Sequence, residues 1–238
     1  LVMRILITND DGLEASQLIP LIKWCRRLGE VTAFVPKYEQ SGKSHGFEIR
    51  RPFEVKQVEP EPGVSIWYVD STPADCVRLA VLGMKQNFDF AISGINRGLN
   101  VGADIMYSGT VAAASEAVNL GIPAIALSTT PENYDNATAE LERIFAYLNE
   151  HDLMSIHNLY NINIPADPKG ICITHQGGPY YSDDFLPIGN DLYQPKGKPI
   201  WKDCQDFTLD TDAALNGYIS IMPLTINRTD WTVYNKLK

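Results

Sequence analysis

Cysteine pairs, an excess of positive charge and long apolar runs are all missing from this chain of 238 residues. No apolar run approaches the length that spans a bilayer, so we expect no membrane partner. The formal net charge of -9 also argues against a nucleic-acid polymer or an anionic membrane surface as the main partner, because both bind basic surfaces. The composition therefore favours a small-molecule partner, and an anionic one would need a local cation.

The four cysteines lie far apart and form no Cys-x-x-Cys pair, which excludes the usual zinc and redox motifs. They indicate structural thiols in a reducing compartment, at positions Cys25, Cys76, Cys172 and Cys204. The residues from Met3 onward are predicted to enter a strand at once, without the basic and apolar regions of a secretory signal. We therefore expect a cytoplasmic protein that starts at Met3.

The order of predicted elements is typical of an α/β protein. An apolar, β-branched run at 5–8 is followed by helical spacing over 18–28, for which Gly29 is the predicted C-cap, and then by a strand at 31–35. Further strands are predicted at 64–69, 88–92, 123–127 and 159–164, and they alternate with helices that begin at 72, near 108 and near 136. This alternation predicts a Rossmann-like, doubly wound, mostly parallel sheet with helices on both faces.

The character of the sequence changes beyond residue 165, where prolines, glycines and tyrosines interrupt short extended runs. We predict one domain over 1–238, with a core formed by about 3–165 and 207–224 and an extended β-hairpin arm over about 175–206. Hairpins of this kind commonly pair between subunits, so a homodimer or homotetramer is expected.

The adjacent acids Asp10 and Asp11 follow the first predicted strand, in the segment Thr8-Asn9-Asp10-Asp11-Gly12. In an open α/β sheet the ligand crevice lies at the carboxyl ends of the strands. Two neighbouring carboxylates repel unless they are paired or bind a metal, and Mg²⁺ or Mn²⁺ would accept their oxygens. A solvated turn whose aspartates cap the next helix explains the pattern equally well.

Two other polar loops are predicted at the same edge of the sheet. Residues 40–46 offer hydroxyl and backbone N–H groups to an oxyanion, and His45 is either a surface residue or a proton donor or acceptor near neutral pH. Residues 93–100 contain Asn96, which could complete an oxygen coordination shell or form an Asx turn. Each loop alone is a weak indication of a site.

The helix start at Ser108-Gly109-Thr110 combines small hydroxyl residues with unpaired N–H groups. Such a start can bind phosphate without requiring a basic protein, because the helix dipole places positive potential there. Simple helix capping is the competing explanation.

Together these segments closely resemble the SurE family, the survival-protein nucleotidases. The resemblance implies a Rossmann-like core, an oligomer that uses extended C-terminal elements, and divalent-metal phosphatase activity toward nucleoside monophosphates. It also implies that one Mg²⁺ or Mn²⁺ per subunit binds Asp10, Asp11, Ser41 and Asn96. The matching segments, which cover nearly the whole chain in order, are RILITNDDG at 4–12, QSGKSH at 40–45, DSTPADCVRLA at 70–80, SGINRGLNVGADIMYSGTVAAASEA at 93–117, GIPAIALS at 121–128, NINIP at 161–165 and DTDAALNGYISIMPL at 210–224.

Our hypothesis is that the ion polarises a phosphoryl oxygen and activates a water, which Asp10, rather than Asp11, orients. The phosphate would bind preorganised donors at Gly42, Ser108, Gly109 and Thr110. The sequence departs from the family at 13–17, where it has Leu-Glu-Ala-Ser-Gln instead of a frequent His-Ala-Pro-Gly stretch, and it matches only loosely at 180–206.

Two alternatives belong to other functional classes. A receiver-like signalling module also binds Mg²⁺ through an acidic pair, but it needs a phospho-accepting aspartate after its third strand. Asp70 is the candidate, although it leads directly into the predicted helix cap Ser71-Thr72-Pro73. A nucleotide-binding protein without catalysis would be expected to carry a Gly-x-Gly-x-x-Gly turn after the first strand, which this sequence lacks there.

Overall fold

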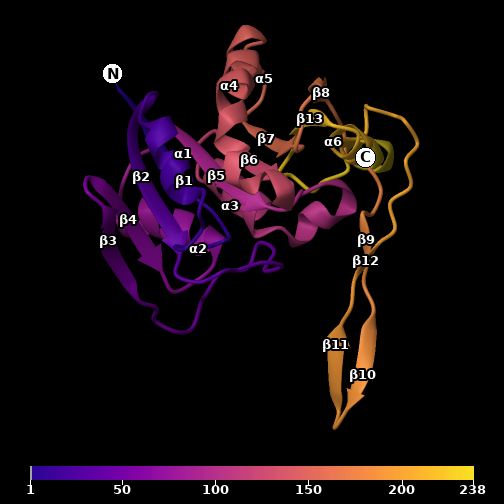
Figure 1. The fold of residues 1–238 in the computed structure, drawn as a ribbon, viewed down its shortest axis with the longest axis horizontal. Helices are drawn as coiled ribbons and strands as arrows, with labels where there is room; N and C mark the ends of the chain where they lie inside the picture. The colour runs from indigo at the N-terminus through magenta and orange to yellow at the C-terminus, as the bar shows by residue number, and fades with distance from the viewer. Residues whose placement is uncertain (1) are drawn as a thin grey trace.

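The apolar segments predicted as strands lie side by side in one mixed sheet in the computed structural model, which describes residues 2–238 (Figure 1). The strand order is β3-β4-β2-β1-β5-β6-β7-β13-β8, and the six strands from β4 to β7 are parallel. The edge strand β3 is antiparallel to β4, and β13 is antiparallel to β7. The bounds are β1 Met3–Thr8, β2 Gly29–Pro36, β3 Val55–Glu61, β4 Val64–Val69, β5 Phe90–Arg97, β6 Ala124–Thr129, β7 Leu159–Ile164, β8 Gly170–Ile173 and β13 Tyr218–Pro223.

Helices cover both faces of this sheet, as the alternation of elements predicted. One core joins α1 (Leu18–Cys25) and α4 (Leu141–Glu150) to side chains such as Ile5 and Ile7 of β1. The second core joins α2 (Pro73–Arg78) and α3 (Gly109–Asn119) to the intervening residue, Leu6. Successive strand residues point to opposite faces, so a strand buried on both sides is apolar at every position. The predicted doubly wound α/β architecture is therefore confirmed.

The predicted helix starts are found where the capping residues place them. The Thr72 hydroxyl accepts a hydrogen bond from the Asp75 backbone N–H at 3.2 Å, with Pro73 as the first residue of α2. The Ser108 hydroxyl likewise accepts from the Val111 N–H at 3.1 Å at the start of α3. A π-helical turn (Leu79–Gly83) continues α2, and the remaining short helices are the 3₁₀ segments Gly102–Tyr107 and Pro131–Glu140, with α5 (Leu153–Ile156), α6 (Asp210–Leu215) and α7 (Trp231–Leu237).

Two local predictions are wrong. Gly29 is not the C-cap of α1, which ends at Cys25, but the first residue of β2. A Cβ atom at Gly29 would lie 2.1 Å from the Met3 carbonyl oxygen, so this glycine permits the close approach of β1 and β2. Asn96 does not lie in a loop either, because β5 continues to Arg97 and pairs Asn96 with Ser128 of β6.

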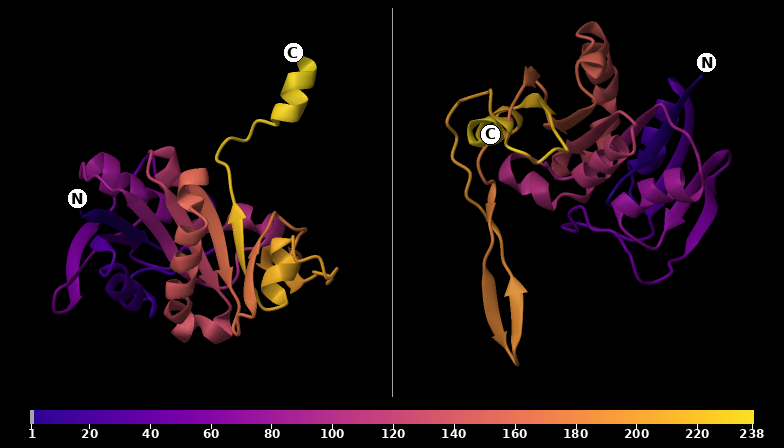
Figure 2. Two further views of the ribbon diagram at one scale, coloured as in Figure 1. Left: turned by 90° about the horizontal axis from the view of Figure 1, so that it is seen from above. Right: turned by 180° about the vertical axis from the view of Figure 1, so that it is seen from behind.

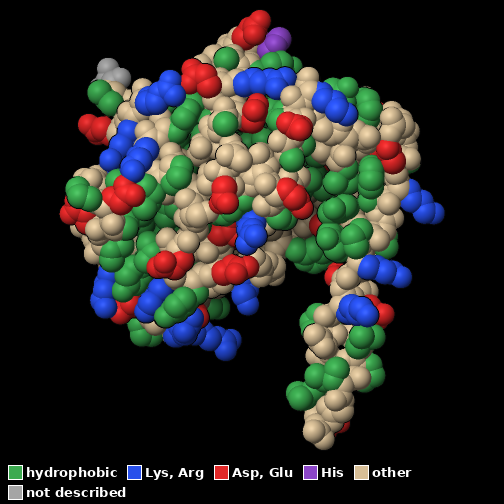
Figure 3. Space-filling model, in the orientation of Figure 1, with side chains coloured by type: hydrophobic (Ala, Val, Ile, Leu, Met, Phe, Trp, Pro, Cys, Tyr) green, Lys and Arg blue, Asp and Glu red, His purple; other side chains and the backbone are tan. Residues whose placement is uncertain are grey.

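The arm is a long, narrow β-hairpin that projects from the body (Figures 1 and 2). Its strands are β9 (Tyr181–Ser182) with β12 (Lys198–Pro199) and β10 (Phe185–Gly189) with β11 (Leu192–Pro195). Asn190 and Asp191 form the tip with φ values of 51° and 57°, a conformation that suits these residue types. Apolar side chains cover much of the arm surface (Figure 3), including Phe185 and Tyr193, which are 61% and 64% exposed. The predicted C-terminal hairpin is therefore confirmed.

The C-terminal residues leave the sheet after β13 and end in α7, which lies away from the body (Figure 2). Among residues 2–238, no helix is both long enough and apolar enough to cross a membrane.

Candidate active site

A tight turn at the carboxyl end of β1 carries Asp10 and Asp11. The Asn9 side chain fixes this turn, since it donates to the Gly12 carbonyl and accepts from the Gly12 N–H, both at 3.0 Å. Gly12 has φ +87°, and a Cβ there would lie 2.9 Å from the Tyr38 carbonyl carbon. The chain that follows β2 therefore packs directly on the acidic turn.

Asp10 is buried against the start of α3. Its carboxylate is 3% exposed and accepts a hydrogen bond from the Thr110 hydroxyl at 2.5 Å. A Cβ atom at Gly109 would lie 2.9 Å from the Asp10 Cβ, so only glycine allows the helix this close. Burial raises the pKa of Asp10 to about 6, and the charge of Asp11 acts in the same direction. Ionisation of the Asp10 carboxyl group therefore costs more free energy in the folded chain than in water.

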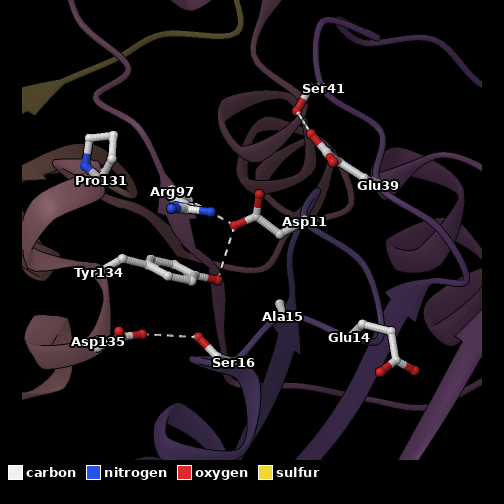
Figure 4. Close-up of a pocket in the computed structure, with 10 residues that line it drawn as sticks. All are labelled: Asp11, Glu14, Ala15, Ser16, Glu39, Ser41, Arg97, Pro131, Tyr134 and Asp135. Carbon is white, nitrogen blue, oxygen red and sulfur yellow. Dashed lines mark hydrogen bonds between the residues drawn. The ribbon is translucent and has the colours of Figure 1, made fainter.

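Asp11 lies beside it with one oxygen engaged (Figure 4). Its Oδ2 accepts from the Arg97 backbone N–H at 3.0 Å and from the Tyr134 hydroxyl at 3.2 Å. Burial raises the pKa of Asp11, while these two hydrogen bonds oppose the rise. Within residues 2–238, neither Asp10 nor Asp11 forms a salt bridge.

A cavity of about 470 Å³ opens in front of Asp11 (Figure 4). Asp11 and Ser41, two of the ligands that the family resemblance implies, both line it, although the Ser41 hydroxyl donates to Glu39 at 2.7 Å. Asn96 and Asp10 do not line this cavity. The Asn96 amide N–H donates to the Gly98 carbonyl at 2.8 Å, which leaves its side-chain oxygen available to a ligand. The lining residues are Asp11, Glu14, Ala15, Ser16, Glu39, Ser41, Arg97, Pro131, Tyr134 and Asp135.

The predicted phosphate-binding residues occupy two different settings. Gly109 and Thr110 lie against Asp10, and the Thr110 hydroxyl already donates a hydrogen bond to the Asp10 carboxylate. The Ser108 hydroxyl caps α3. Gly42, with φ +71°, has no atom within 4 Å of a would-be Cβ, so its backbone lies open to solvent. Backbone N–H groups, rather than hydroxyls, are thus the free donors here.

These residues fit a hard divalent cation. In the described part of the chain no three His, Cys, Asp or Glu side chains are grouped as a metal site, so an ion here would rely on Asp10, Asp11 and neutral oxygens. Two adjacent carboxylates with raised pKa values, neither of which forms a salt bridge with a described residue, would both be stabilised by such an ion. An all-oxygen donor set suits Mg²⁺ or Mn²⁺.

Sequence reasoning missed two residues that contact Asp11. Tyr134 lies 123 positions away in the chain and belongs to no recognised motif, so only the fold brings it to the site. Arg97 immediately follows Asn96, and the need for a local cation could have drawn attention to it. Its side chain is the one basic group among the lining residues of the cavity.

Two other candidates lie elsewhere. His45 does not line the Asp11 cavity, and its imidazole contacts Glu116 of α3. Asp70 lines a separate cavity of about 250 Å³ with Ser71 and Thr72. Since β2 separates β4 from β1 in the sheet, the aspartate that a receiver-like site would need is not next to the acidic pair.

Comparisons with known proteins identify the family of this chain. The family model of survival protein SurE matches residues 5–183. The 5'-nucleotidase SurE of Thermoanaerobacter sp. (strain X514) is 36% identical over 250 residues, which cover 99% of this chain and 97% of that protein. The 5'-nucleotidase SurE of Legionella pneumophila is 34% identical, with coverages of 99% and 96%.

A solved structure is similar over the same extent. The crystal structure of the Sure protein from Aquifex aeolicus matches with a TM-score of 0.79 and 30% sequence identity, covering 99% of this chain and 98% of that one. The resemblance predicted from the ordered motifs is therefore confirmed, and the chain belongs to the SurE family.

Proposed function

We propose that this chain is a divalent-metal-dependent phosphomonoesterase that hydrolyses nucleoside monophosphates to nucleoside and phosphate. The observation that carries the proposal is the acidic pair of the buried Asp10 and the half-buried Asp11. This pair has no salt-bridge partner among the described residues and lies beside the start of α3. The name 5'-nucleotidase, carried by relatives that match over nearly their whole length, supports the substrate class.

One Mg²⁺ or Mn²⁺ would be held by Asp10, Asp11, Ser41 and Asn96. When bound, such an ion supplies Lewis-acid chemistry toward a phosphoryl oxygen and lowers the pKa of water. The chain's own residues set the geometry: Thr110 orients Asp10, while Tyr134 and the Arg97 N–H orient Asp11.

The substrate phosphate would lie at the start of α3 and be met by the N–H groups of Gly42 and Gly109. Two hydroxyls stabilise the proposed phosphate position: that of Ser108 caps α3, and that of Thr110 donates to Asp10. Arg97 adds a positive charge in the cavity, which the acidic chain otherwise lacks at this position.

Asp11 is the better candidate to orient the attacking water. It lines the cavity, whereas Asp10 is 3% exposed and packed behind it. This assignment differs from the expectation that Asp10 orients the water, because the exposure of the two carboxylates cannot be compared from the sequence alone.

The hairpin arm supports a proposal about assembly. Its apolar side chains, among them Phe185, Ile188, Leu192 and Tyr193, have no core of their own to pack into. Pairing with a second copy would bury them, so a homodimer or homotetramer is proposed. Sedimentation analysis of the full chain should give a mass of two or four subunits, and a monomer at all concentrations would contradict it.

The test of the activity is a substrate panel with the purified chain. Nucleoside 5′-monophosphates, 3′-nucleotides and short polyphosphate are incubated with Mg²⁺, Mn²⁺ or EDTA, and released phosphate is measured. We expect multiple turnovers with a divalent ion, loss of activity in EDTA and recovery when the ion is restored. Equal turnover in EDTA would reject the metal dependence. A single stoichiometric transfer that leaves a stable aspartyl phosphate would favour the signalling alternative.

A further inference from the structure

The loop at residues 40–46 is bordered by three separate cavities. Ser41 lines the cavity of Asp11, Lys43 lines the cavity of about 250 Å³, and Ser44 and His45 line a third of about 650 Å³. Side-chain packing therefore does little to fix this loop. Its position depends on a small number of hydrogen bonds.

Three of these bonds come from the beginning and the middle of the loop. The Gln40 N–H donates to the Asp10 carbonyl at 2.7 Å. Ser44 donates through its N–H to the Tyr107 carbonyl at 3.0 Å and through its hydroxyl to the Met106 carbonyl at 2.7 Å. The loop thus crosses from the acidic turn to the segment that precedes α3.

The next residue, His45, contacts a buried carboxylate. His45 Nε2 lies 2.7 Å from Glu116 Oε2, and the Arg78 guanidinium of α2 donates to Glu116 Oε1 at 2.9 Å. Glu116 is only 5% exposed. Burial by itself raises the pKa of Glu116, but the hydrogen bonds from His45 and Arg78 outweigh it and lower the pKa. A buried carboxylate of this kind is costly unless both of its oxygens are paired.

Glu116 and Gly109 lie on one face of the same helix. They are seven residues apart in α3, which corresponds to two turns and about 10 Å. The first turn holds Asp10 through Gly109 and Thr110, and the later turn holds the loop through His45. One rigid element therefore fixes both the acidic turn and the loop that faces it.

We propose that Glu116 is a positioning residue for the metal site: through His45 it holds Ser41 and Gly42 over Asp10 and Asp11. The inference rests on the proposed function, because it assumes that these residues bind the ion. Loss of the contact between His45 and Glu116 would let the loop leave the cavity while the acidic pair stays in place.

The test is direct calorimetric titration of Mn²⁺ into the full chain, which does not depend on turnover. His45→Ala should weaken Mn²⁺ binding about 10-fold, the lower end of what loss of an outer contact costs a metal site. His45→Gln should retain most of the affinity, because its amide N–H can donate to Glu116. Glu116→Gln should weaken binding as His45→Ala does.

His151→Ala is the matched control. His151 is an exposed residue that follows α4, on the opposite face of the sheet from α3, and its ring contacts that of Tyr147 at a tilted angle of 48°. Its removal should leave the affinity unchanged. Amide hydrogen exchange over 41–46 should accelerate in His45→Ala and not in His151→Ala.

Wild-type Mn²⁺ affinity in His45→Ala would overturn the inference, and so would a lower melting temperature without any change in affinity. A wild-type chain that binds no Mn²⁺ would overturn it together with the metal site. A chain that shows the predicted pattern of Mn²⁺ affinities but releases no phosphate from nucleoside monophosphates would reject the proposed function alone.

Discussion

Two short acidic segments, Asp10-Asp11 after β1 and Asp210-Thr211-Asp212 at the start of α6, are alike in sequence, and each contains a fully buried aspartate. Their surroundings differ. Asp210 accepts backbone N–H bonds from Gly102 at 2.8 Å and from Gly177 at 2.7 Å, so it joins two distant loops.

Asp212 is satisfied in the same way. It accepts from the Trp201 indole at 2.8 Å and from the backbone N–H groups of Cys204 and Asp206, each at 3.0 Å. Asp10, in contrast, has the Thr110 contacts and a second carboxylate as its neighbour. A buried carboxylate that accepts hydrogen bonds from several N–H groups holds separate segments of the chain together. A buried carboxylate beside another carboxylate is instead suited to bind a cation.

The largest effect is expected from a substitution that breaks the acidic pair. Asp10→Asn removes a proposed metal ligand and should reduce metal-dependent phosphate release by a factor of about 1,000, or ~4 kcal/mol of transition-state stabilisation. Released phosphate is measured at saturating Mn²⁺ with a nucleoside monophosphate. Asp191→Asn at the exposed hairpin tip is the control and should be fully active. Near-normal turnover of Asp10→Asn would sink the metal-site assignment.

The next effect tests the other acidic segment. Asp210→Ala leaves the buried N–H group of Gly102 and the half-buried N–H group of Gly177 without an acceptor, which should lower the free energy of unfolding by about 3 kcal/mol. Urea denaturation measures it. Asp167→Ala, at an exposed position, should change the free energy by less than about 0.5 kcal/mol. Similar values for both variants would contradict the structural role assigned to Asp210.

The third prediction concerns pH in the absence of metal. Burial raises the pKa of Asp10 from 3.8 to about 6, so between these values the folded chain keeps a proton that the unfolded chain has lost. The contribution of Asp10 to stability therefore falls as pH rises through this window, by about 3 kcal/mol in all.

Asp10→Asn removes this penalty but disturbs the Thr110 hydrogen bond, so above pH 6 it should be about 2 kcal/mol more stable than the metal-free wild type. Near pH 4 the ionisation penalty is absent and only the disturbed hydrogen bond remains, so the variant should be about 1 kcal/mol less stable than the wild type. Added Mn²⁺ should stabilise the wild type more than the variant, because the ion binds ionised carboxylates. A variant that is less stable than the wild type at pH 8 without metal would show that the pair is structural after all.

The smallest expected effect concerns the orientation of Asp11. Tyr134→Phe removes the hydroxyl that donates to Asp11 at 3.2 Å and should weaken Mn²⁺ binding about fivefold, equivalent to ~1 kcal/mol. Calorimetric titration measures the change. Tyr147→Phe, on α4, is the matched control and should bind Mn²⁺ as the wild type does. Equal losses in the two variants would remove Tyr134 from the site.

The sequence was sufficient for the central sheet because its strands contain continuous runs of apolar residues, of which β1 is the clearest. Ile5, Leu6 and Ile7 are all fully buried, and this continuous pattern indicates a strand covered on both faces. The edge strand β3 was not predicted because it lacks such an apolar run. In β3 three of the seven residues between Val55 and Glu61 are intermediate and four exposed, so the strand has no apolar run to recognise. Gly29 was assigned to the wrong element because its role depends on contact with Met3.

The candidate site divides in the same way. Asp10, Asp11 and the start of α3 could be predicted because chain neighbours form each feature. Tyr134 and Glu116 could not, since their contacts with Asp11 and His45 span 123 and 71 positions and depend on how the helices cover the sheet. Local pattern finds the groups that carry charge, and tertiary packing decides which side chains orient them.

Gly109 sets a limit on how this protein can vary. Any other residue there adds a Cβ that would lie 2.9 Å from the Asp10 Cβ and 3.2 Å from the Pro73 ring. Relief requires α3 to move away from β1, and Glu116 and its hold on His45 would move with it. In a saturation library, many side chains should therefore be tolerated on the hairpin arm and almost none at position 109. Substitutions at position 109 should abolish activity in a chain that still folds.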